Sequence, residues 1–219
     1  MPQERTLVTE THGRYLIEPG KGGAGLLVGF HGYAESAEHE LQRLASIPGA
    51  EHWTRVSVQA LHRFYRGRTS EVVASWMTTE DRDTAIADNL TYVRRVIEQV
   101  KAPREPAEVV FDGFSQGAAM AYRSACSFAQ RVLGVIALAG DVPPELDEVA
   151  LGRIPAVLIG RGVRDEWYSE EKLDADEVRL RAAGVRLRIF RFDGGHEWTE
   201  EFADAAARFL GEIISKTAL

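Results

Sequence analysis

The stretch that most constrains this chain is residues 109–117, VVFDGFSQG. Two valines and a phenylalanine predict a buried strand, and the small residues after Gly117 predict the start of a helix. Between them, Gly113-x-Ser115-x-Gly117 fits a nucleophile elbow, a sharp turn that strains the serine backbone and exposes its hydroxyl. Neither glycine has a Cβ atom to collide where strand and helix meet. An ordinary strand–helix turn is the alternative, so Ser115 needs partners elsewhere in the chain.

Length and composition indicate the class of protein. The chain has 219 residues, 45% of them hydrophobic and 27% charged, which suits one globular α/β domain over residues 1–219. A net charge of −7 argues against nucleic acid or an anionic membrane as the main partner. The first residues lack the basic-then-apolar pattern of a signal peptide, and Cys126 has no second cysteine to pair with. We therefore expect a cytoplasmic protein without stable membrane association, of open oligomeric state.

Alternating strand and helix patterns predict a mostly parallel sheet covered by helices on both faces. Strands are expected at residues 5–10, 14–18, 26–30, 55–59, 109–111, 133–139, 156–159 and 185–190. Helices are expected at 37–46, 81–101, from 118 onward, at 170–183 and at 199–215, with residues 60–79 as a long loop. The first two strands would form an opening hairpin. Only residues 140–153 follow the strand at 133–139, which leaves no room for a large cap domain.

A serine nucleophile needs a general base, and the base needs an acid to orient it. In parallel sheets, functional groups gather in loops beyond the carboxyl ends of the strands. His196 follows the strand at 185–190, and two glycines precede it; a surface histidine is the alternative. Asp165 follows the strand at 156–159 and is better placed than Glu166, although it could be a solvated loop residue. The order Ser115, Asp165, His196 is that of the α/β-hydrolase triad.

Acyl transfer also needs two N–H donors directed at the developing oxyanion. The backbone N–H of Gln116, at the start of the elbow helix, is one candidate. The other is the backbone N–H of Tyr33, because Gly32 allows the loop after the strand at 26–30 to turn an amide inward. We expect His31 to be a hydrogen-bonded structural residue rather than a second base.

Four motifs together resemble the phospholipase/carboxylesterase family of α/β-hydrolases, which includes acyl-protein thioesterases. They are Phe30-His31-Gly32, Gly113-Phe114-Ser115-Gln116-Gly117, Gly160-Arg161-Gly162-x-x-Asp165 and Gly195-His196-Glu197. The resemblance covers residue 26 to the C-terminus. It implies hydrolysis of esters or thioesters by Ser115, Asp165 and His196, without a cofactor, and it supports Tyr33 and Gln116 as oxyanion donors. Two departures concern the acyl pocket: Tyr33-Ala34-Glu35 replaces a Leu-Gly-Asp type of segment, and Ala118 stands where a third glycine is common.

Aromatic residues near these motifs are candidates for the substrate pocket. They are Trp76, Trp167, Phe114 and Tyr65, and packing of a long loop onto the core is the alternative. In the same loop, Arg63, Arg66 and Arg68 either bind an anionic group of the substrate or are solvated, and we favour solvation. No sequence pattern supports a metal site.

These observations predict a serine carboxylesterase of small-molecule esters that works through an acyl-enzyme. An acyl-protein thioesterase or a lysophospholipase is the enzymatic alternative. A degenerate hydrolase fold that only binds a ligand is the non-enzymatic one.

Overall fold

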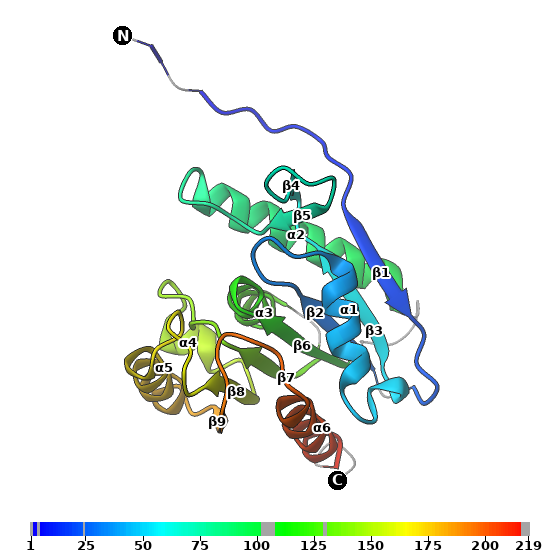
Figure 1. The fold of residues 1–219 in the computed structure, drawn as a ribbon, viewed down its shortest axis with the longest axis vertical. Helices are drawn as coiled ribbons and strands as arrows, with labels where there is room; N and C mark the ends of the chain where they lie inside the picture. Colours follow the sequence, from blue (N-terminus) through cyan, green and yellow to red (C-terminus); the bar gives the residue numbers. More distant parts are fainter. Residues whose placement is uncertain (1, 4, 24, 102–107, 129–130, 216–219) are drawn as a thin grey trace.

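A seven-stranded sheet forms the centre of the molecule, in the order β1-β3-β2-β6-β7-β8-β9 (Figure 1). The computed structural model describes residues 2–3, 5–23, 25–101, 108–128 and 131–215. The strands of this sheet are β1 (Arg14–Glu18), β2 (Leu26–Phe30), β3 (Thr54–Gln59), β6 (Glu108–Phe114), β7 (Arg131–Leu138), β8 (Ala156–Gly162) and β9 (Arg186–Phe192). Strand β1 pairs antiparallel with β3, and the other neighbours pair in parallel. The expected mostly parallel sheet is confirmed.

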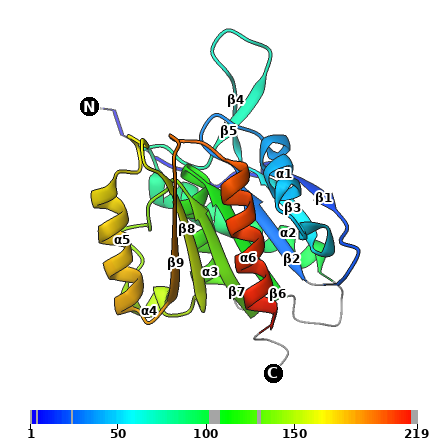
Figure 2. The same ribbon diagram turned by 60° about the horizontal axis from the view of Figure 1, so that its bottom comes forward.

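Helices cover both faces of the sheet (Figure 2). They are α1 (Ala37–Ser46), α2 (Arg82–Val100), α3 (Gln116–Ser127), α4 (Glu148–Leu151), α5 (Glu170–Ala182) and α6 (Glu200–Ser215), with a short 3-10 turn at Ala50–His52. On one face α2, α3, α4 and α5 close over an apolar core that includes Trp76, Tyr122 and Tyr168. On the other, α1 and α6 cover a second apolar core that includes Trp53, Phe202 and Phe209.

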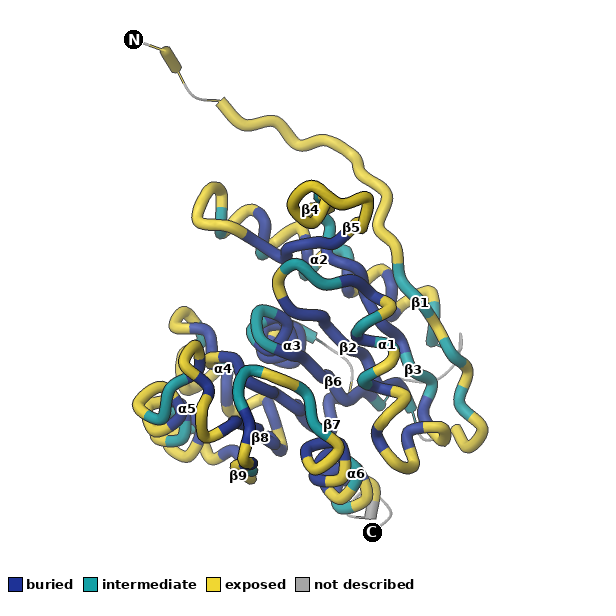
Figure 3. The backbone as a smooth tube through the Cα atoms, in the orientation of Figure 1, coloured by how far each residue is buried: buried dark blue, intermediate teal, exposed yellow. Residues whose placement is uncertain are grey.

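Burial explains why the central strands read as continuous apolar runs. Every residue of β2 and of β8 is buried, as expected for strands with helices on both sides (Figure 3). The edge strands β1 and β9 consist mostly of exposed and half-buried residues instead. Because the interior strands are buried on both faces, they hold the start of each following loop in a fixed position.

The expected opening hairpin is wrong. Residues 5–10 form no strand, and β1 pairs with β3 rather than with the segment before it. Leu7 and Val8 are 91% and 93% exposed, and the segment extends away from the body of the protein (Figure 1). A strand-like pattern forms a strand only where its side chains pack against a sheet, and residues 5–10 are all exposed.

The expected long loop at residues 60–79 is also wrong, because it contains a hairpin. Strands β4 (His62–Tyr65) and β5 (Val72–Ser75) pair antiparallel and project from the body of the protein (Figure 2). The turn between them has Gly67 in the left-handed region, at φ 55°. A bridge between Glu35 and Ala74 attaches the hairpin to the loop after β2.

The segment after β7 holds only the four-residue helix α4, whose first turn Asp147 caps by accepting a 2.8 Å hydrogen bond from the Ala150 N–H. Among the described residues there is thus no large cap domain, as expected. None of the helices in the described part of the chain is both long and apolar enough to cross a membrane.

Candidate active site

Ser115 lies between β6 and α3 in a backbone conformation that side chains rarely adopt. Its φ is 54° and its ψ −119°. The turn is held because the Ser115 N–H donates to the Leu138 carbonyl oxygen at 2.8 Å. A Cβ atom at Gly113 would collide with the backbone of Gly117, and one at Gly117 with the Phe30 carbonyl. Both glycines are therefore required by the close approach of strand and helix.

His196 lies beside Ser115. Its Nε2 atom is 2.8 Å from the Ser115 Oγ, and its Nδ1 atom is 2.9 Å from the Asp165 Oδ2. The structure thus brings together three residues that follow β6, β8 and β9, as expected for the carboxyl edge of a parallel sheet. In this arrangement the imidazole can take the serine proton, and the carboxylate can stabilise the imidazolium that forms.

Asp165 is oriented by its own loop. Its other carboxylate oxygen, Oδ1, accepts hydrogen bonds from the N–H groups of Trp167 and Tyr168 at 2.8 and 2.9 Å. The carboxylate is buried, whereas the alternative acid Glu166 is exposed. Arg161 also stabilises this loop, because its guanidinium donates to the Tyr168 carbonyl at 2.7 Å and to the Glu170 carboxylate at 2.8 Å. Sequence reasoning did not assign Arg161 this role, although it stands within the motif that was singled out.

The two expected oxyanion donors belong to the loop after β2, in the case of Tyr33, and to the first residue of α3, in the case of Gln116. Neither the Tyr33 N–H nor the Gln116 N–H has an acceptor among the residues that the structure describes. The Gln116 side chain is engaged elsewhere: its Oε1 accepts from the Trp76 N–H at 2.9 Å, and its Nε2 donates to the Met77 carbonyl at 2.9 Å. Gln116 therefore leaves its main-chain N–H free while its side chain ties α3 to the segment after β5.

His31 is buried and bonded at both ring nitrogens. Its Nε2 accepts the Ala60 N–H at 3.1 Å, so its Nδ1 carries the proton and donates to the Gly32 carbonyl at 2.7 Å. Burial lowers the pKa of His31 to about 4. This neutral, doubly bonded histidine fits the expected structural role and has no contact left for base catalysis.

Residues 16–179 match the profile of the phospholipase/carboxylesterase family. The chain belongs to this family. Its members, and the structural neighbours of the chain, include carboxylesterases and thioesterases, which are hydrolases acting on ester bonds. The search of curated proteins found no match.

Solved structures of similar fold cover nearly the whole chain. Esterase PE8 is 22% identical, with a TM-score of 0.76 over 93% of this chain and 100% of its own. Acyl-protein thioesterase 2 from Zea mays is 18% identical, with a TM-score of 0.72 over 93% of this chain and 100% of its own. The carboxylesterase of Bacillus cereus is 17% identical, with a TM-score of 0.71 over 92% of this chain and 94% of its own. At these identities the likeness shows the α/β-hydrolase fold.

Four aromatic residues were expected to line the substrate pocket. Phe114 contacts the candidate site, Trp167 and Tyr65 are exposed, and Trp76 is buried. The Phe114 ring lies 5.1 Å from the His196 ring, centroid to centroid. Trp167 is 76% exposed and Tyr65 is 65% exposed. Trp76 is wholly buried, and its indole N–H donates to the His31 carbonyl at 2.8 Å. For Trp76 the packing alternative describes the structure, because no part of its ring faces solvent.

Two of the three arginines singled out in the hairpin, Arg63 and Arg66, bind acceptors of the protein itself. Arg63 donates to the His12 carbonyl, and Arg66 donates to the Ala34 carbonyl and pairs with Glu71. Arg63 and Arg66 therefore use some of their donors within the protein. Among the described residues there is also no cluster of three His, Cys, Asp or Glu that could hold a metal ion.

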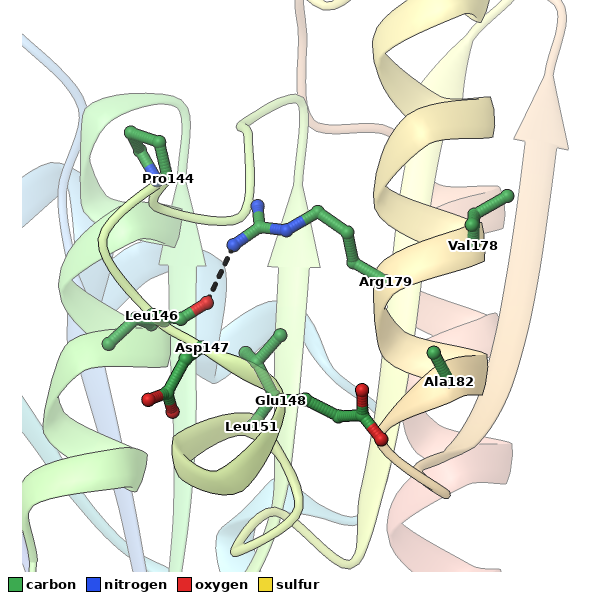
Figure 4. Close-up of a pocket in the computed structure, with 8 residues that line it drawn as sticks. All are labelled: Pro144, Leu146, Asp147, Glu148, Leu151, Val178, Arg179 and Ala182. Carbon is green, nitrogen blue, oxygen red and sulfur yellow. Dashed lines mark hydrogen bonds between the residues drawn. The ribbon is translucent and has the colours of Figure 1, made fainter.

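A separate surface cavity of about 370 Å³ lies between α5 and the segment after β7 (Figure 4). Arg179 of α5 reaches into this region and donates to the Leu146 carbonyl at 2.8 Å. Ser115, Asp165 and His196 do not line this cavity. It is therefore distinct from the candidate active site.

Two residues near the site were not expected from the sequence, Glu35 and Arg43. The Arg43 guanidinium lies 4.2 Å from the centre of the Phe114 ring, on which His196 also packs. Glu35 accepts the Gly32 N–H at 2.8 Å. The only sequence signal was that Glu35 stands at the end of the segment in which this chain departs from its family.

Proposed function

We propose that this chain is a serine carboxylesterase that works through an acyl-enzyme. Ser115 attacks the acyl carbon, His196 takes the serine proton and delivers it to the leaving alcohol, and Asp165 stabilises the imidazolium. A water molecule activated by His196 then cleaves the acyl-enzyme. The observation that carries the proposal is the continuous chain of hydrogen bonds from Asp165 through His196 to the Ser115 hydroxyl, 2.9 and 2.8 Å long.

The proposed oxyanion site consists of the N–H groups of Tyr33 and Gln116. Its support is that both donors lack a partner among the described residues, and that Gln116 directly follows Ser115. The Gln116 N–H also lies at the N-terminus of α3, where the helix dipole favours a developing negative charge.

We propose Phe114, Trp167 and Tyr65 as the apolar surroundings of the substrate. Phe114 touches His196, and the main chain of Trp167 is held on Asp165, so a group bound against either ring is close to the reacting atoms. Under this proposal the protein is one catalytic domain acting on small esters, with no cofactor, in the cytoplasm.

Thioester hydrolysis is the second candidate, favoured by the fold likeness to an acyl-protein thioesterase and by the exposed Trp167 ring, which could contact a long acyl chain. The test compares p-nitrophenyl esters with acyl thioesters of equal chain length, using the wild type and S115A. Esters should be the better substrates by kcat/KM. The S115A variant should lose about four orders of magnitude or more in kcat on both series. A wild type that prefers thioesters would support the second candidate, and an S115A variant with undiminished turnover would reject both.

A further inference from the structure

The loop between β2 and α1, residues 31–35, carries the proposed Tyr33 donor and is held from several sides. Ala34, at φ 56°, donates its N–H to the Ala74 carbonyl at 3.0 Å. The Glu35 carbonyl in turn accepts the Ala74 N–H at 2.8 Å. These contacts fix the path of the loop but not the orientation of the Gly32–Tyr33 peptide, whose N–H would meet the oxyanion.

That peptide is oriented by bonds on both sides of Gly32. A peptide unit is planar and trans, so its C=O and N–H point in opposite directions. His31 donates to the Gly32 carbonyl, which turns the Tyr33 N–H away from His31. The preceding Gly32 N–H donates to the Glu35 carboxylate at 2.8 Å. A Cβ atom at Gly32 would lie 2.9 Å from this carboxylate and 3.0 Å from the Phe114 ring, so the fit is tight.

Arg43 holds the Glu35 carboxylate in place. Its two terminal nitrogens donate to the two carboxylate oxygens of Glu35, each at 2.6 Å, which is the paired geometry in which arginine binds carboxylates most strongly. The side chains are only 14% and 18% exposed, so solvent screens the pair weakly. Burial opposes the charge on Arg43, but the hydrogen bonds of Glu35 and the nearby Glu40 outweigh it and raise the Arg43 pKa.

Further groups hold Arg43 from the side of the sheet. Glu40, wholly buried one helical turn before Arg43, pairs with its guanidinium at 3.2 Å. Next to Glu40 lies Asp112 of β6, whose pKa is raised well above its usual value by burial and by Glu40. Burial and Glu40 thus favour the protonated form of Asp112, and Arg43 supplies the positive charge that pairs with Glu35 and Glu40. The guanidinium face rests on Phe114, which in turn packs on His196.

We propose that Glu35 and Arg43 are positioning residues for the esterase reaction. Through Glu35 the ion pair orients the Gly32–Tyr33 peptide for the oxyanion, and through Phe114 the guanidinium supports the His196 ring. Neither residue touches the reacting atoms. The inference rests on the proposed function, since it needs Ser115 as nucleophile and the Tyr33 N–H as an oxyanion donor.

The test measures transition-state stabilisation separately from substrate binding. In E35A, kcat for a short p-nitrophenyl ester should fall roughly 10- to 100-fold while KM stays within about two-fold. The Ki of an aryl trifluoromethyl ketone should rise by the factor by which kcat/KM falls. This inhibitor mimics the oxyanion, because Ser115 Oγ adds to its carbonyl carbon, His196 takes the proton and the carbonyl oxygen becomes negative. The R43K variant should lose activity in the same way, because lysine keeps the charge but lacks the planar guanidinium that directs one nitrogen at each carboxylate oxygen.

The matched control is E38A, which removes an exposed carboxylate of α1 that pairs with Arg14, and it should keep wild-type kcat. Unchanged kcat in E35A, or a raised KM with unchanged kcat, would overturn the inference. So would a lower kcat with an unchanged Ki. If E35A does not fold, the same readings on R43K decide. Failure of the underlying function is distinguishable, since it would appear as full activity in S115A.

Discussion

At the scale of the residue, the candidate site combines side chains that the sequence could identify with others that it could not. Ser115 and His196 stand in motifs whose glycines indicate a tight turn, so the positions of both residues could be predicted. Arg43 stands in an ordinary amphipathic helix, and its contacts with Glu35 and Phe114 come from other elements. A role that depends only on contacts distant in sequence leaves no local pattern from which to predict it.

Asp165 supports a prediction at this scale. In D165N, kcat should fall by about 10³- to 10⁴-fold, because an asparagine amide favours the wrong tautomer of His196. The protein should remain folded, since the asparagine oxygen can still accept the N–H groups of Trp167 and Tyr168. Steady-state kinetics and urea unfolding measure the two quantities.

The control for this prediction is D193N. Asp193 is exposed, lies in the loop that carries His196 and pairs with Arg164. This variant should keep wild-type kcat. A D165N variant that retains more than a tenth of the activity would show that Asp165 does not orient the base.

At the scale of the element, the bounds of a helix or strand could be predicted where its sequence pattern is long or begins at a capping residue. Helix α1 has the expected bounds, and its first turn is closed by a capping box of Ser36 and His39. The β4–β5 hairpin could not be predicted, because its strands have four residues each and a mixed pattern of burial. The segment at 5–10 shows the opposite error, in which a strand-like pattern stays exposed and joins no sheet.

The loop after β2 gives a prediction about pH, through His31. The folded pKa of about 4 lies below the unfolded value of about 6.5, so the contribution of His31 to stability is fully present above pH 6.5 and is lost as pH falls through 4. The free energy of unfolding should therefore fall by up to about 3 kcal/mol over this range from His31 alone. In H31Q this component of the slope should be absent.

Urea unfolding at several pH values measures that slope. The control is H52Q, which changes a histidine whose side chain is 62% exposed and should leave the slope as in the wild type. Equal slopes in H31Q and the wild type would mean that His31 becomes protonated in the folded protein without cost.

At the scale of the whole molecule, the parallel sheet is what brings together residues 81 and 31 positions apart. That these residues meet could be predicted from the order of strands and helices, because parallel strands present their carboxyl ends at one edge. The order of the strands in the sheet could not be predicted, because β2 pairs with β6 across a long stretch of intervening chain. Such pairing depends on packing of both faces rather than on any local signal.

The most direct test of the account is labelling with a fluorophosphonate, followed by mass spectrometry of the peptides. The account predicts a single adduct on Ser115 in the wild type, none in S115A, and much slower labelling in H196Q, where no base activates the serine. An adduct on another residue, or equal labelling of the wild type and S115A, would contradict it.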